Sequence, residues 1–391
     1  MKSPTHVTVA SDSLHASSDK RLILAAQLAF LPTGVLTTLL GPMLPILMAR
    51  WALNDTQAGN LFLVQFLSSL VGVQLSGVLL SRLGFRPAFL LGLLLMACGT
   101  ATLLLGSVGI GFASVAVYGL GLGLIVPTDN LLIAEISPGS RSGAVSLLNF
   151  FWGFGAVFCS LMIAWAAAHR ALPVFLGAVT VFLLVLALGM RNLAFPPAAV
   201  DQSSTSNWRD VARTPTFWLF AAVFFLYPGA ETAVGGWIGS YVSRLGPHEA
   251  TVAPLMPAFF WAALTTGRGL GTFFLSRVPE NRLLRAGFAT GSAGIVCMLW
   301  STSLRGVILG ALITGLSYST LYPVTVARLS QRFGVAARSI GAVMFSLASI
   351  GPALIPWMVG LTSQATGSLR AGLSLPLGAT LILFLIHLWD W

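Results

Sequence analysis

The chain has 391 residues, of which 56% are hydrophobic and only 8% are charged, and its formal net charge is +10. A soluble protein carries about 25% charged residues, so this composition excludes an ordinary soluble domain and indicates a polytopic membrane protein. Nucleic acid is not an expected partner, because the chain has no basic soluble domain to bind it. The expected surroundings are the lipid bilayer, in which we expect a monomer.

Twelve apolar stretches are each long enough to cross a bilayer, which takes about 20 residues. Residues 1–21 are polar and precede the first stretch, so we expect a disordered tail there. The expected spans are 22–49, 58–81, 87–106, 110–136, 142–168, 172–191, 215–244, 251–276, 282–302, 305–329, 336–363 and 369–389. The sequence therefore predicts an all-helical protein with twelve transmembrane helices.

The one long polar stretch inside the chain divides the spans into two groups of six. It predicts a linker at 195–214 between halves at 22–194 and 215–391. Short motifs recur in order from one half to the other: Ser81-Arg82-Leu83 returns as Ser276-Arg277-Val278, 195 residues later. Two parallel six-helix repeats of this kind are typical of transporters.

The positions of lysine and arginine predict the orientation. With both termini in the cytoplasm, fifteen of these residues fall on inside segments and five on outside loops, and Arg268 is left within a span. This asymmetry follows the positive-inside rule. We therefore expect the tail, the linker and both termini to be cytoplasmic.

The loop after the second span has the sequence GVLLSRLGFR, from Gly77 to Arg86. It resembles the signature loop of the major facilitator superfamily, G-x-x-x-D-R-x-G-R, and the resemblance extends over nearly the whole chain. Ser81 stands where the family usually has aspartate. The resemblance implies the twelve-helix major facilitator fold, with a cytoplasmic gate near this loop.

A finer resemblance rests on YPGAETAVGGW from Tyr227, SLLNFFWGFGA from Ser146 and FFWAALTTGR from Phe259. With Asn130 in the fourth span, these motifs resemble the fucose permease-like sugar:proton symporters and related glucose permeases. The resemblance implies proton-coupled sugar uptake, with Asn130 among the substrate contacts. That group often carries a glutamate four residues before the asparagine, where this chain has Val126.

Glu231 is the carboxylate of the apolar stretch Phe225–Val242, flanked by Pro228-Gly229 and Gly235-Gly236. A charge in hydrocarbon costs about 2.5–3.5 kcal/mol on insertion scales, so an acid there is a candidate functional group. Proline and glycine are expected to bend this helix and free main-chain groups. Glu231 is the first candidate for proton coupling; a static salt bridge is the alternative.

Two further acids lie in the fourth span. Asp129 is the second candidate for proton coupling, and it is expected either to face the cavity or to pair with cytoplasmic arginines. Glu135 lies closer to the loop. We expect it to form a gate salt bridge with Arg82, Arg86 or Arg141 at the cytoplasmic side.

Arg268 lies in the eighth span, with Trp261 and Thr265 at helical spacing on the same stripe. An aromatic ring, a hydroxyl and a guanidinium together suit a polyol. The alternative is an arginine that extends to the membrane surface. The distance from Arg268 to the end of this span is long for such a side chain, about 12 Å of helix. An ion pair with Glu231 or Asp129 is therefore the favoured hypothesis.

Neutral polar side chains on several spans are further candidates for substrate binding, although each also fits ordinary interhelical hydrogen bonding. They are Gln65, Ser69, Asn130, Asn149, Trp152, Tyr227, Tyr318, Tyr322 and Thr325. A lining with few formal charges suits a neutral, hydroxyl-rich solute.

The chain carries no catalytic, metal-binding or nucleotide-binding motif, so we expect neither an enzyme nor a cofactor. The leading hypothesis is a secondary active transporter of a bacterial inner membrane that takes up a neutral sugar-like solute with a proton by alternating access. A sodium-coupled sugar transporter and an exporter of drugs or metabolites are alternatives on the same fold. A membrane receptor without transport activity is a fourth possibility, which the buried acids disfavour.

Overall fold

The computed structural model describes residues 6–105, 107–137, 141–196, 212–270, 277–334 and 337–388. Among these residues, twelve helical segments are long and apolar enough to cross a membrane. The predicted class is confirmed: the chain is an all-helical, multi-pass membrane protein. Most of the expected linker, 197–211, lies outside the described residues.

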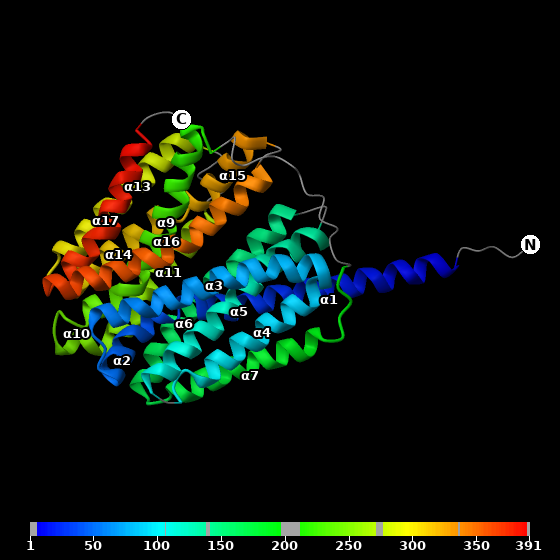
Figure 1. Ribbon diagram of the computed structural model, residues 1–391, viewed down its shortest axis with the longest axis horizontal. Coiled ribbons are helices and arrows are strands. Elements are labelled where there is room, and N and C mark those ends of the chain that lie inside the picture. The colour runs from blue at the N-terminus through cyan, green and yellow to red at the C-terminus, as the bar shows by residue number, and fades with distance from the viewer. Residues whose placement is uncertain are drawn as a thin grey trace, which may run out of the picture.

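The first six spans are built from seven helices. They are α1 (His6–Thr38), α2 (Leu40–Trp51), α3 (Asp55–Leu83), α4 (Phe85–Thr102), α5 (Val108–Ile136), α6 (Arg141–Ala168) and α7 (Leu172–Met190). The helix α1 starts within the stretch expected as a tail, and Figure 1 shows this part extending away from the other helices.

The last six spans form a second group of helices. They are α9 (Pro215–Val242), α10 (Pro247–Val252), the short 3-10 helix η1 (Ala253–Leu255), α11 (Met256–Gly269), α13 (Glu280–Trp300), α14 (Leu304–Tyr318), α15 (Leu321–Phe333), α16 (Ala337–Thr366) and α17 (Leu369–Ile386). Figure 1 shows the two groups side by side, close together near α2 and α10 and diverging toward the end that carries α15. We call these the α10 end and the linker end.

Glycines allow the two halves to approach closely at the α10 end. A Cβ on Gly59 of α3 would lie 3.0 Å from the carbonyl oxygen of Trp357 on α16. A Cβ on Gly41 of α2 would lie 2.7 Å from the carbonyl oxygen of Gly235 on α9. Small residues let membrane helices pack backbone against backbone, so this end is closed by direct helix contact.

The seventh span has no break in its helical main chain, although its prolines and glycines could have produced one. The helix α9 is continuous from Pro215 to Val242, with Pro228 inside it. Its glycines accommodate neighbouring side chains: a Cβ on Gly235 would meet the Trp261 ring at 2.7 Å, and one on Gly236 would meet the Phe62 ring at 2.6 Å. Both glycines are needed for close packing. The sequence alone does not show whether a glycine serves close packing or a break in the helix.

The tenth span is an interrupted helix, in which α14 ends at Tyr318 and α15 begins at Leu321. Pro323 has no main-chain N–H and cannot bond the carbonyl of Ser319, four residues earlier. The main chain is therefore irregular between α14 and α15, beside the acid of α9.

Candidate functional site

A group of polar and aromatic side chains from both halves meets where α6, α9 and α11 come together. We call it the central polar cluster, and its members are Trp152, Tyr227, Glu231, Trp261, Thr265 and Arg268. Each was expected from the sequence as a site residue, and the structure brings them together.

Tyr227 and Glu231 lie one turn apart on α9, and the Tyr227 hydroxyl is hydrogen-bonded to Glu231 Oε2. The same hydroxyl is 2.9 Å from the main-chain oxygen of Tyr318, at the end of α14. A hydroxyl has one proton and both neighbours can accept it. The Glu231 carboxyl therefore keeps a hydrogen bond in either charge state: it accepts when ionised, and it donates when protonated and Tyr227 donates to the carbonyl.

Arg268 is the cationic partner of this acid. Its Nη2 lies 3.9 Å from Glu231 Oε2, and the two side chains are 21% and 12% exposed. Its guanidinium also lies over the Trp152 ring, 5.5 Å from the centroid, a cation–π distance. Two ion pairs were expected for Arg268, and the structure contains the one with Glu231. The alternative, an Arg268 side chain that extends to the membrane surface, is not what the structure shows.

Three polar atoms on one stripe of α11 are buried without a hydrogen-bond partner among the described residues. They are Trp261 Nε1, Thr265 Oγ1 and Arg268 Nε. A buried polar group left unpaired costs about 1–3 kcal/mol. Three such groups at helical spacing therefore form a surface suited to a ligand with several hydroxyl groups.

Aromatic side chains join the two halves beside this stripe. The Trp152 and Trp261 rings meet edge to face with centroids 5.7 Å apart. A Cβ on Gly153 would lie 2.6 Å from Thr265 Oγ1, so the glycine lets α6 approach α11 at this level. The faces of tryptophan rings suit the apolar face of a sugar ring.

The tyrosines of the tenth span complete one side of the cluster. The Tyr227 ring lies 5.3 Å from that of Tyr318 and 6.3 Å from that of Tyr322. The Tyr318 hydroxyl is hydrogen-bonded to Thr380 of α17, and Thr325 Oγ1 donates to the carbonyl of Leu321. Tyr322 is only partly buried and so remains a candidate contact.

Other candidate substrate contacts are engaged elsewhere. Gln65 Nε2 donates to the carbonyl of Thr37 at 3.0 Å, and its Oε1 accepts from the Tyr118 hydroxyl at 2.8 Å. These bonds link α1, α3 and α5 within the first half. The amides of Asn130 and Asn149 donate to carbonyls of their own helices at 2.8 and 2.9 Å.

Asp129 lies apart from the central polar cluster. Its side chain is fully buried, and neither carboxylate oxygen has a hydrogen-bond partner among the described residues. Ile125, one turn earlier, contacts the Gly92 position of α4, so Asp129 lies on the face of α5 that packs on α4. Of its two expected arrangements, the pair with a cytoplasmic arginine does not occur among the described residues.

The residues expected at the cytoplasmic gate lie at the linker end. Arg82, Arg86 and Glu135 are exposed and have no ion pair with a described residue, and the Arg141 side chain lies outside the described part. The halves diverge at this end (Figure 1). Their pairing therefore remains a prediction for a conformation closed on this side.

Outside the spans, His387 follows the end of α17 and packs on Phe288, with ring centroids 4.9 Å apart. Burial lowers the pKa of its imidazole to about 4. This side chain therefore stays neutral near pH 7.

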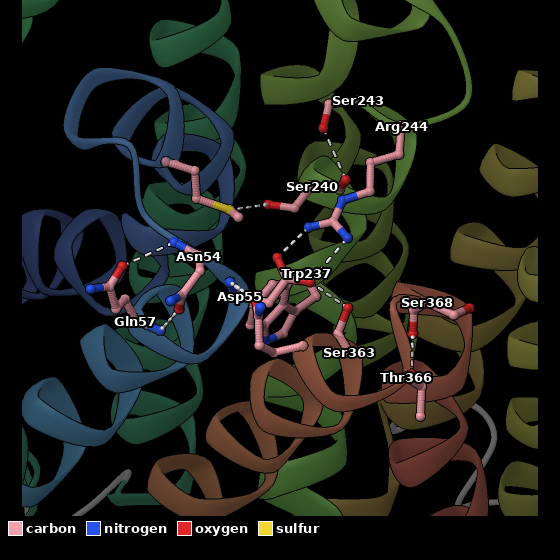
Figure 2. A network of polar contacts seen from close by, with 12 residues as sticks. Asn54, Asp55, Gln57, Trp237, Ser240, Ser243, Arg244, Ser363, Thr366 and Ser368 are labelled. Carbon is pink, nitrogen blue, oxygen red and sulfur yellow. Dashed lines mark hydrogen bonds and ion pairs between the residues drawn. The ribbon is translucent and has the colours of Figure 1, made fainter.

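An ion pair between the halves at the α10 end was not expected from the sequence. Arg244, just after α9, binds Asp55 at the start of α3, and Ser363 of α16 bonds the same carboxylate (Figure 2). No role was predicted for Arg244, which is the last residue of the seventh span expected from the sequence. The sequence carried only a weak signal for this ion pair. One half has a helix start that an asparagine can cap, and the other half has a single arginine at the end of a span.

Two six-helix groups, in contact at one end and with a buried polar cluster between them, are the architecture of a membrane transporter. The family profile described as Major Facilitator Superfamily matches residues 28–356. The chain belongs to this superfamily, as its signature loop predicts.

Several relatives and solved structures are similar to this chain over most of its length. A glucose/galactose transporter of Brucella abortus biovar 1 (strain 9-941) is 25% identical over 372 residues, which cover 87% of each chain. Sodium-dependent glucose transporter 1A of Mus musculus is 22% identical and covers 85% of this chain and 87% of its own. The crystal structure of a D-xylose-proton symporter superposes with a TM-score of 0.76 at 16% identity, covering 95% and 97%.

Proposed function

We propose that the protein takes up a neutral, sugar-like solute together with a proton by alternating access. The observation that carries this proposal is the ion pair of Glu231 with Arg268, beside three unpartnered polar atoms of α11. Glu231 exchanges the proton, and the three polar atoms of α11 beside it are free to bind the hydroxyl groups of the solute.

A sugar fits this surface better than an apolar drug does. Trp261 Nε1 and Arg268 Nε can only donate hydrogen bonds, and Thr265 Oγ1 can donate or accept. A sugar hydroxyl accepts and donates, so it can pair with all three. An apolar solute would leave them unpaired. The names of the Brucella and mouse relatives support glucose-like sugars as the first solutes to test.

A proton fits the acid better than sodium does. A sodium ion at Glu231 would lie beside the guanidinium of Arg268, which repels it. A proton adds no volume and uses the Tyr227 hydroxyl as its hydrogen-bond partner. The mouse relative is named as sodium-dependent, so sodium is the alternative that the experiment must separate.

The function is tested with purified protein in liposomes that enclose a pH-sensitive dye. Adding D-glucose, D-galactose or D-xylose outside is expected to acidify the lumen without sodium, because the solute carries protons inward. A response that requires sodium would support the sodium-coupled alternative. A proton flux opposite to the sugar would indicate an exporter, and no response to any sugar would contradict the proposed solute class.

The same assay tests the α11 stripe with Trp261→Phe, which keeps a ring but removes the Nε1 donor. Because one hydrogen bond is worth about 0.5–1.5 kcal/mol, half-saturation is expected at a sugar concentration roughly two to ten times higher. The matched control is Trp300→Phe, on the exposed end of α13, which should behave as the parent. Equal half-saturation in both variants would remove Trp261 from the binding surface.

We further propose that both termini are cytoplasmic and that the membrane is a bacterial inner membrane. The distribution of lysine and arginine supports this orientation. A cysteine placed at Ser203, in a chain without its native cysteines, is expected to react with an impermeant thiol reagent only in inside-out vesicles. Reaction only in intact cells would reverse the orientation.

A further inference from the structure

The ion pair at the α10 end joins residues that are far apart in sequence. Arg244 Nη1 donates to Asp55 Oδ2 at 3.0 Å, and Nη2 donates to Oδ1. Ser363 Oγ donates to Asp55 Oδ2 at 2.5 Å. Figure 2 shows these side chains converging from the two halves. A bidentate arginine–carboxylate pair fixes both position and orientation, so the halves are held in one register here.

Asp55 is also held by contacts other than its pair with Arg244. Asn54 caps α3 and forms a capping box with Gln57, and Asp55 is the first residue of that helix. The amino end of a helix favours a negative charge. The Asp55 N–H donates to Gln364 Oε1 of α16 at 3.2 Å, so the second half contacts the backbone of Asp55 as well as its side chain.

Tight apolar packing surrounds the pair. Gly59, one turn along α3 from Asp55, lies against Trp357 of α16. Phe62 of α3 and Trp237 of α9 have ring centroids 6.2 Å apart. Asp55 itself is only 8% exposed. The halves are therefore in direct contact between the α10 end and the central polar cluster, and a solute cannot pass there without their separation.

We propose that Asp55, Arg244 and Ser363 form the outer gate of this transporter: a polar lock that holds the α10 end closed and must open once in each cycle. The inference rests on the proposed alternating-access function and its orientation. None of the three residues touches the central polar cluster, so they act on the conformational equilibrium and leave the chemistry of the solute site unchanged.

The pair is suited to repeated opening. The Arg244 side chain is 38% exposed and that of Asp55 is 11% exposed, so water reaches both groups as soon as the halves part. Regained hydration then offsets much of the lost attraction. Apolar packing alone would hold the halves together but would not fix their register.

The test measures how often this end opens, with no solute present. The reporter is Ser240→Cys in a chain whose Cys98, Cys159 and Cys297 are replaced by alanine. Ser240 is buried on α9 and lies 3.8 Å from the Met48 sulfur of α2, so it becomes accessible only when the halves part. Asp55→Asn and Arg244→Gln are expected to speed labelling by an impermeant reagent from outside about tenfold, equivalent to about 1.4 kcal/mol.

The matched control is Arg370→Gln, an exposed arginine on α17 near the same end with no ion pair to a described residue. It should label at the parent rate. The exchanged pair, Asp55→Arg with Arg244→Asp, should return labelling toward that rate. Equal labelling in Asp55→Asn, Arg244→Gln and Arg370→Gln would overturn the gate.

Two milder variants decide the question if the charge-removing variants fail to reach the membrane. Ser363→Ala removes one hydrogen bond, and Arg244→Lys keeps the charge but loses the bidentate geometry. Both variants are expected to label faster than the parent but by less than the tenfold expected for the charge-removing variants. Parent-like labelling rates in both would overturn the proposal. Because no sugar is added, this outcome is independent of whether the sugar assay succeeds.

Discussion

Replacing Glu231 with glutamine is expected to abolish uphill accumulation of the solute while leaving downhill exchange. Glutamine has nearly the shape of glutamate, and its amide oxygen can still accept from Tyr227 and Arg268. It cannot bind or release a proton. Solute binding and the movement of the halves should therefore persist, separated from the proton gradient.

The size of this loss follows from the driving force. A membrane potential of about 100 mV is worth about 2.3 kcal/mol per proton, which supports roughly a fiftyfold accumulation of a neutral solute. The variant should equilibrate labelled sugar at a ratio near one. The measurement compares accumulation in energised vesicles with counterflow in vesicles preloaded with unlabelled sugar.

Two other carboxyl variants show whether the effect belongs to Glu231. Glu249→Gln, in the short helix α10, makes the same chemical change away from the cluster and should accumulate as the parent does. Asp129→Asn tests the second candidate for coupling, whose carboxylate is buried against α4. Normal accumulation by Glu231→Gln, with an unchanged pH dependence, would contradict the proton role of Glu231.

Local sequence was sufficient to predict the spans and much of the cluster. Hydropathy over about 20 residues reports insertion directly, and each half repeats the same pattern. Trp261, Thr265 and Arg268 share a face because helical spacing places them there. The cost of burying Glu231 and Arg268 also made an ion pair between them one of two expected outcomes, and the structure contains it.

Contacts between distant segments could not be predicted in this way. Gln65 was a candidate either for substrate binding or for interhelical hydrogen bonding, and in this conformation its amide bonds to Thr37 and Tyr118. The sequence alone could not decide between the two, because no periodicity reports which helices pair. The Asp55–Arg244 pair joins two helix ends from different halves. Such pairs depend on how the halves dock, which single-sequence patterns do not contain.

The positions of helix breaks also depend on tertiary packing. Pro228 lies within a continuous α9, whereas Pro323 lies just after the interruption between α14 and α15. Both prolines lack an N–H, but neighbouring helices determine whether the local main chain stays helical. The tenth span therefore contains an irregular segment, with the Tyr318 carbonyl directed at the Tyr227 hydroxyl.

Replacing Arg268 with alanine is expected to leave Glu231 without its cationic partner and to remove the contact with the Trp152 face. Breaking a buried pair by removing one member costs about 3–5 kcal/mol; because these side chains are partly exposed, the loss should lie at or below the lower value. We propose that protonation of Glu231 releases Arg268 in the normal cycle, which ties proton binding to movement of α9 and α11 relative to α6. The variant should therefore lose coupled uptake.

Double-mutant cycles identify the partner of Arg268. Arg268→Ala combined with Glu231→Gln should recover part of the stability and exchange activity, because the second change removes the unpaired charge. The coupling energy is expected to be at least about 1 kcal/mol, within the range for residues in contact. Arg268→Ala with Asp129→Asn should be additive within about 0.5 kcal/mol, as for separated sites. Thermal unfolding in detergent and sugar exchange in liposomes measure both cycles, and strict additivity in both would mean that Arg268 holds neither acid.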